Sequence, residues 1–203
     1  MDRHPGREPS RPAAGKIGDL LADLSSGDEA RAESAAPKLA ALGEAIIPSM
    51  RRLLDSDDAD ARWWAIRTLA SLPSLDVRLV LPSLADSAPE VRQCAALGLC
   101  AHPSEASIPF LIRALSDSDS LAAELAARAL AAVGEPATGS LLEVLKEAKP
   151  SARIHAMRAL AEIADPRSIR PMIEAMSEES AMLHYWAEIG LERMGVNMIY
   201  VKP

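Results

Sequence analysis

The feature that most constrains this fold is an internal repeat of 30 or 31 residues. Six positions begin its copies: Arg31, Ala61, Val91, Ala122, Ala152 and Leu183. Four residues after each of them stands an alanine, and eight residues after each stands a leucine. At about 100° per residue, the start position and the positions four, eight and eleven residues later share an arc of about 80° on an α-helix. The repeat therefore predicts six helices that each bury one stripe of small and branched side chains against neighbouring copies.

A second helical pattern and a set of turn residues complete each copy. The apolar spacing of Ile108, Leu111, Ile112 and Leu115 predicts a helix before the one that starts near Ala122. Residues that stop helices follow five of the six repeat helices: Gly43, Pro73, Pro103, Gly134 and Gly195. Nearly half of the residues are apolar but only 3% are aromatic, which favours close-packed helices over a sheet. The sequence therefore predicts an all-α protein with two helices per copy.

Three further positions carry a resemblance to a known family. The position one residue after each start position holds arginine in several copies, among them Arg62 and Arg92. Fourteen residues before this position stands a proline in two copies, Pro48 and Pro109, and six residues before it stands an acid such as Asp86. On these residues the chain resembles the HEAT-repeat family, in particular bacterial HEAT-like repeats of the phycobilisome-lyase-like type. The resemblance implies a right-handed α-solenoid of about six two-helix repeats with a period of 30–31 residues. It also implies a ladder of hydrogen bonds between acids and arginines of neighbouring repeats, which the spacing of Asp86 and Arg92 suits.

The repeat sets the expected domain boundaries. We expect the repeat domain over residues 16–195, with its first and last copies acting as caps. Residues 1–15 contain charges and prolines but no apolar signal core, which predicts a disordered N-terminal tail. The C-terminal tail, residues 196–203, holds the apolar run 198–201. This tail could cover the last repeat or dock on a partner.

A candidate binding surface lies opposite the predicted buried stripe. In HEAT-like solenoids the second helices line the concave wall, so the positions two, five and six residues after each start position are expected on that wall. They are unusually apolar for a surface in water and include a broken row of arginines, which is typical of an interaction site. The expected partner-binding residues are Trp63, Ile66, Arg67, Leu97, Arg128, Ile154, Met157, Arg158, Tyr185 and Ile189. The alternative is that these side chains pack on one another in a tightly curved wall.

Several classes of function lack support in the sequence. The net charge of -7 and the pI of about 5.2 argue against a sequence-independent nucleic-acid binder, and no apolar run approaches the roughly 18 residues of a membrane span. Cys94 and Cys100 would face different directions on one helix, so neither a disulfide nor a metal pair is expected. Phosphate-loop, dinucleotide-binding, HExxH and CxxC motifs are absent. We therefore expect a cytoplasmic protein that is not an enzyme, with no cofactor and no bound metal, and the resemblance implies that it is bacterial.

These observations favour a scaffold or adaptor that binds another protein, through an apolar and acidic helix or peptide, on its concave wall. The resemblance implies two alternatives. Phycobilin lyases of the HEAT type hold a bilin and help to attach it to a cysteine of a phycobiliprotein, and the propionates of a bilin would suit Arg67, Arg128 and Arg158. A HEAT-like DNA glycosylase is the other alternative, although the acidic charge of the chain weakens it.

Overall fold

The computed structural model describes residues 12–196, and the part of the chain that it describes is helical, with short 3₁₀ turns and no strand. The chain divides into two compact units, residues 1–73 and residues 74–203. The predicted tails fall mainly on residues 1–11 and 197–203, which lie outside the described residues. Helix α1 (Pro12–Leu24) begins four residues before the expected start of the repeat domain. The chain has the fold of an α-solenoid, as predicted.

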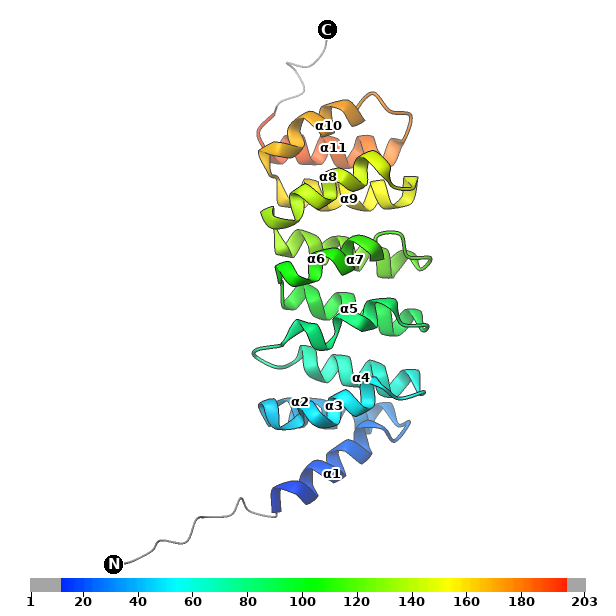
Figure 1. The fold of residues 1–203 in the computed structure, drawn as a ribbon, viewed down its shortest axis with the longest axis vertical. Helices are drawn as coiled ribbons and strands as arrows, with labels where there is room; N and C mark the ends of the chain where they lie inside the picture. The colour runs from blue at the N-terminus through cyan, green and yellow to red at the C-terminus, as the bar shows by residue number, and fades with distance from the viewer. Residues whose placement is uncertain (1–11, 197–203) are drawn as a thin grey trace, which may run out of the picture. The chain divides into compact units, whose positions relative to one another are not determined.

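The first unit contains two helix pairs (Figure 1). Helix α1 packs against α2 (Glu29–Ala40), and α3 (Ile47–Leu54) packs against α4 (Ala59–Ala70). A 3₁₀ turn, Gly43–Ile46, leads into α3. Contacts between α2 and α4 join the two pairs.

The second unit contains four further copies. Its repeat helices are α5 (Pro89–Ala101), α7 (Ser120–Val133), α9 (Pro150–Ile163) and α11 (Ala181–Arg193). These helices pack on one another in that order, as Figure 1 shows for the green to red part of the chain. The partner helices are α6 (Ile108–Ala114), α8 (Glu135–Glu147) and α10 (Ile169–Ala175). Before α5 the partner is reduced to two 3₁₀ turns, Val77–Leu79 and Leu81–Ala85.

The predicted stripe forms the core in both units. The alanine four residues after each start position and the leucine eight residues after it are at most 1% exposed in all six copies. Alanine lets two helices approach closely, and the leucine fills the space beside the contact. The buried-stripe prediction is therefore confirmed at these two positions, whereas Arg31 at the start of the first copy and Leu42, eleven residues after it, are exposed.

Polar residues define where the helices begin and end. Asp28, Asp119 and Ser180 each accept a backbone N–H of the first turn of their helix, which satisfies donors that have no partner within the helix. Gly134 ends α7 with a φ of 81°. The corresponding position after α9 is Ala164, whose φ of 55° lies in the left-handed region that glycine prefers.

The expected ladder is present between α5 and the turn that precedes α7. Nε and Nη2 of Arg92 donate to the two carboxylate oxygens of Asp117 at 2.7 and 2.8 Å. Nη1 of the same guanidinium donates to the main-chain carbonyl of Asp86 at 2.9 Å. The carboxylate that pairs with Arg92 is thus the acid of the following repeat, 25 residues further along the chain. Asp86 accepts a hydrogen bond from Arg92 through its main-chain carbonyl instead of its carboxylate. Arg153 and Glu178 repeat this spacing, with Nη2 2.6 Å from Oε1.

Candidate functional site

The predicted binding residues are distributed over the two units. Trp63, Ile66 and Arg67 lie on α4 in the first unit, and the others lie on α5, α7, α9 and α11 in the second.

Two of the predicted surface residues are in the core. Ile66 is 0% exposed and Met157 is 1% exposed, so the expectation that they face a partner is wrong. Each repeat helix packs against neighbouring repeat helices as well as its partner helix. The position five residues after the start lies about 140° around the helix and is covered by these neighbours. The buried arc is therefore wider than the stripe that the sequence pattern defines.

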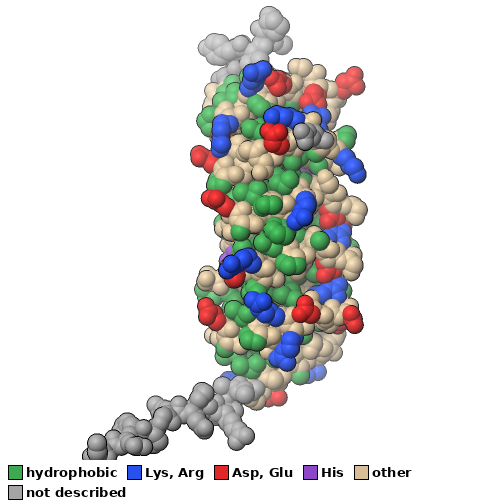
Figure 2. All heavy atoms as spheres, viewed as in Figure 1, with side chains coloured by type: hydrophobic (Ala, Val, Ile, Leu, Met, Phe, Trp, Pro, Cys, Tyr) green, Lys and Arg blue, Asp and Glu red, His purple; other side chains and the backbone are tan. Residues whose placement is uncertain are grey.

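The exposed apolar residues of the second unit lie on one side of its repeat helices. Leu97 and Tyr185 are 49% and 52% exposed, and Ile154 and Ile189 are partly exposed. Leu121 and Met182, at 46% and 47%, were not among the predicted residues. Both stand one residue before a start position, at about 260° around the helix, next to the predicted positions two and six residues after the start, which lie at about 200° and 240°. Including this neighbouring position in the prediction would have found them. Figure 2 shows hydrophobic side chains reaching the surface among basic and acidic ones.

The aromatic pair of the first unit is held within its own helix and by α2. The Trp63 ring meets Trp64 edge to face, with centroids 4.8 Å apart, and the Arg67 guanidinium lies 5.4 Å from the Trp63 centroid. Arg67 is also 3.8 Å from the Glu33 carboxylate, and both side chains are well exposed. Trp63 is therefore half-buried, and Arg67 already has an acidic neighbour.

Arg158 is fully engaged within the second unit. Its Nη1 lies 3.0 Å from Glu124 of α7, its Nε donates to Glu162 of α9 at 3.2 Å, and its guanidinium lies 5.1 Å from the Trp186 ring of α11. The side chain is 22% exposed. Burial, and then the nearby Arg158, lowers the pKa of His155. Arg158 therefore connects three helices and is poorly placed to meet the acid of a partner.

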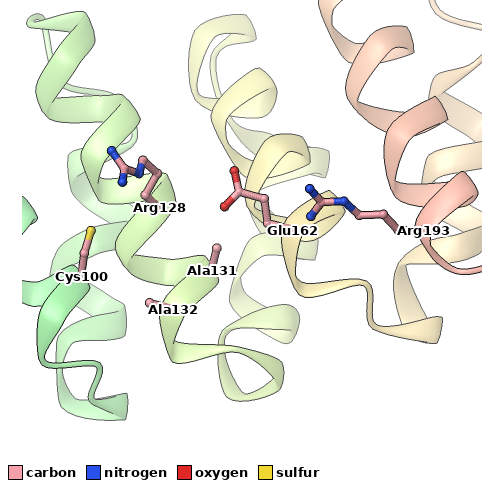
Figure 3. A pocket seen from close by; sticks show the side chains of 6 residues that line it. All are labelled: Cys100, Arg128, Ala131, Ala132, Glu162 and Arg193. Atoms are coloured by element: carbon pink, nitrogen blue, oxygen red, sulfur yellow. The ribbon is translucent and has the colours of Figure 1, made fainter.

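A pocket of about 450 Å³ opens where the C-terminal ends of four repeat helices meet. Cys100 comes from α5, Arg128, Ala131 and Ala132 from α7, Glu162 from α9 and Arg193 from α11. Figure 3 shows Glu162 between the two arginines, with the alanines below Arg128. Of these six residues the sequence prediction contained only Arg128. Residues from four repeats contribute, so no local motif marks the site.

The charged side chains of the pocket differ in whether they have ion-pair partners. Neither Arg128 nor Arg193 forms an ion pair with a carboxylate among the described residues, and Arg193 donates to the main-chain carbonyl of Ala161 at 3.5 Å. Glu162, in contrast, is paired with Arg158. Burial raises the pKa of the Cys100 thiol, whose sulfur lies 3.6 Å from the Leu125 carbonyl. The thiol therefore stays protonated near neutral pH and is a weak nucleophile.

Two kinds of site are missing from residues 12–196. No three His, Cys, Asp or Glu side chains in that range are grouped to hold a metal ion. No helix in the same range is long and apolar enough to cross a membrane.

Family models and one curated protein match parts of this chain. The model for HEAT repeats matches residues 77–143, and the model for the PBS lyase HEAT-like repeat matches residues 152–178. The beta subunit of phycocyanobilin lyase from Nostoc sp. (strain PCC 7120 / SAG 25.82 / UTEX 2576) is 35% identical over 99 residues, which is 49% of each chain. The chain therefore spans about half the length of this relative.

Solved structures support the fold. The complex of CpcE and CpcF of phycocyanin lyase from Nostoc sp. PCC7120 contains a chain that matches with a TM-score of 0.57 and 23% identity, over 72% of this chain and 98% of that one. A designed armadillo repeat protein in complex with the peptide (KR)4 matches with a TM-score of 0.51 and 17% identity, over 88% and 99% of the two chains. At these identities the likeness concerns the fold alone.

The comparisons correct one prediction from the sequence. We expected a protein that is not an enzyme, but the curated relative is a subunit of a lyase, an enzyme that attaches a chromophore. The prediction failed because it required a local catalytic motif, and helical repeats are defined by their packing residues. The models for HEAT repeats and for the PBS lyase HEAT-like repeat thus match two parts of this chain, which confirms the resemblance to HEAT repeats of the phycobilisome-lyase type that the sequence predicted.

Proposed function

We propose that this chain is a subunit of a lyase that attaches a bilin to a cysteine of an acceptor protein. The observation that carries the proposal is the 35% identity to a phycocyanobilin lyase subunit over 99 residues. The described pocket supports it, because its volume of about 450 Å³ falls in the range of small-molecule sites. We do not expect the bilin to be attached to Cys100 of this chain, since burial raises the pKa of the thiol and favours its protonated form.

The lyase subunit is also proposed to work with a second protein chain. CpcE and CpcF form a complex in the solved structure from Nostoc. In this chain the exposed apolar residues Leu97 and Tyr185 lie on the same side of the repeat helices as Arg128. Exposed apolar residues beside a cation suit a partner helix or peptide that carries apolar and acidic side chains. Trp63 and Arg67 provide a second, smaller contact of the same chemistry in the first unit.

Pigment transfer tests the lyase activity. The purified chain would be loaded with phycocyanobilin and mixed with apo-phycocyanin, alone and with CpcE or CpcF of Nostoc supplied in turn. Covalent pigment on the acceptor would be read as fluorescence on a denaturing gel. We expect transfer above the spontaneous background in at least one mixture. Background transfer in all three, with a chain that is folded by circular dichroism, would rule out this function.

The partner surface has a separate test. Leu97→Glu/Tyr185→Glu is expected to weaken the complex with the second chain at least tenfold, because hot-spot side chains typically contribute more than about 1.4 kcal/mol. Ser140→Glu, at an exposed position of α8, is the matched control. Equal affinities for the two variants would place the partner on another face.

A further inference from the structure

The pocket at the helix ends contains two arginines that lack acidic partners among the described residues. Arg128 and Arg193 come from α7 and α11 and are both exposed. Most other arginines of the unit are paired: Arg92 with Asp117, Arg153 with Glu178, and Arg167 with Asp165. Guanidinium groups that have no carboxylate partner among the described residues and line one pocket are suited to bind carboxylates in two-pronged geometry.

The carboxylate between these arginines is held by a different residue. Glu162 accepts a hydrogen bond from Nε of Arg158, and Arg158 is fixed in turn by Glu124 and by the Trp186 ring. Glu162 is therefore oriented from outside the pocket and is not needed to neutralise Arg128 or Arg193. Its remaining lone pairs can accept N–H groups of a ligand.

We infer that the pocket recognises a ligand with two carboxylates and N–H donors, in which Arg128 and Arg193 bind the carboxylates and Glu162 accepts the N–H groups. Ala131 and Ala132 also line the pocket and present small apolar side chains to the body of the ligand. This inference rests on the proposed function, under which the carboxylates are the two propionates of the bilin and the donors are its pyrrole N–H groups. It replaces the expected use of Arg67 and Arg158 as propionate ligands, because Arg158 is already bound to two acids.

An esterified pigment separates the contacts of the two arginines with the carboxylates from the contact of Glu162 with the N–H groups. Dissociation constants would be measured by absorbance titration for phycocyanobilin and for its dimethyl ester, whose propionates carry no charge. The chains compared are wild type, Arg128→Gln/Arg193→Gln, each single arginine variant, and Glu162→Gln. Arg170→Gln is the control, because Arg170 lies outside the pocket on α10 and is 89% exposed. Melting curves would establish that every variant is folded.

We expect wild type and Arg170→Gln to bind the free acid at least tenfold more tightly than the ester, as charge-assisted hydrogen bonds predict. Arg128→Gln/Arg193→Gln should bind both forms as weakly as wild type binds the ester, and each single variant should lose part of the difference. Glu162→Gln should weaken both forms equally and move the long-wavelength absorption band, since it contacts the N–H groups. Equal binding of acid and ester by wild type would overturn this inference and leave the proposed function standing. Binding of neither form by any chain would overturn both.

Discussion

The pair of Arg92 and Asp117 gives the sharpest test of how neighbouring repeats hold together. Both side chains are largely buried, with 13% and 8% of their surfaces exposed. The guanidinium makes two hydrogen bonds to the carboxylate and one to the Asp86 carbonyl. Arg92→Ala would remove all three and leave the Asp117 carboxylate without its main counter-charge.

The size of the effect follows from this burial. Removing one partner of a buried ion pair costs about 3–5 kcal/mol, because the other charge stays buried and unpaired. Asp117 also accepts the backbone N–H of Asp119 at 2.8 Å, which places Arg92→Ala near the lower end, at about 3 kcal/mol. Arg92→Ala/Asp117→Ala should be more stable than Arg92→Ala, since no charge is left unpaired. Arg78→Ala is the control: Arg78 makes the same kind of pair with Asp76 but is 79% exposed, so no measurable change is expected.

Urea unfolding followed by circular dichroism at 222 nm would measure these differences. A loss of about 3 kcal/mol lowers the midpoint by about 1–2 M at typical slopes. Repeat arrays can unfold in steps, so the fluorescence of Trp186 in the second unit should be followed alongside, with Trp63 and Trp64 replaced by phenylalanine in every chain compared. If Arg92→Ala and Arg78→Ala had equal midpoints, or if the double variant were the least stable, the pair would not hold the repeats together as described.

Three further variants test other details. Ala164→Gly should stabilise the protein by about 1 kcal/mol, because Ala164 has a φ of 55°, and a lower melting temperature would contradict this. Hydrogen bonds from Arg167 lower the pKa of Asp165 to about 2. The stabilisation relative to Asp165→Asn should therefore be about 2 kcal/mol above pH 4 and be lost as the pH falls through 2. Urea unfolding measured between about pH 5 and pH 1 would refute this if the difference between the two chains did not change with pH. A Cβ at Gly190 would lie 2.6 Å from the Met172 sulfur and 3.1 Å from the Ala161 Cα, whereas a Cβ at Gly139 would have no such neighbour within 4 Å. Gly190→Ala should thus melt lower than Gly139→Ala by an amount equivalent to about 1–3 kcal/mol.

The ion-pair partners of the arginines were the feature that the sequence predicted least well. Arg67, Arg128 and Arg158 occupy the same position of the repeat, and all three were expected to face a partner's acids. In the structure Arg67 lies near Glu33, Arg158 is held by Glu124 and Glu162, and Arg128 has no acidic partner among the described residues. Which acids a guanidinium reaches depends on the side chains that the neighbouring helices present, and equivalent positions differ in this respect.

The sequence by itself determined the helices and their buried stripes, because the periodic alanines and leucines act within one helix and its immediate neighbours. It also indicated the family through residues such as Pro109 and Arg92. Only the tertiary structure decided that Ile66 and Met157 are buried, since each repeat helix is covered from more than one side. The pocket of Arg128, Glu162 and Arg193 was likewise decided by the packing of helices, which brings together residues that are far apart in the chain and carry no common motif.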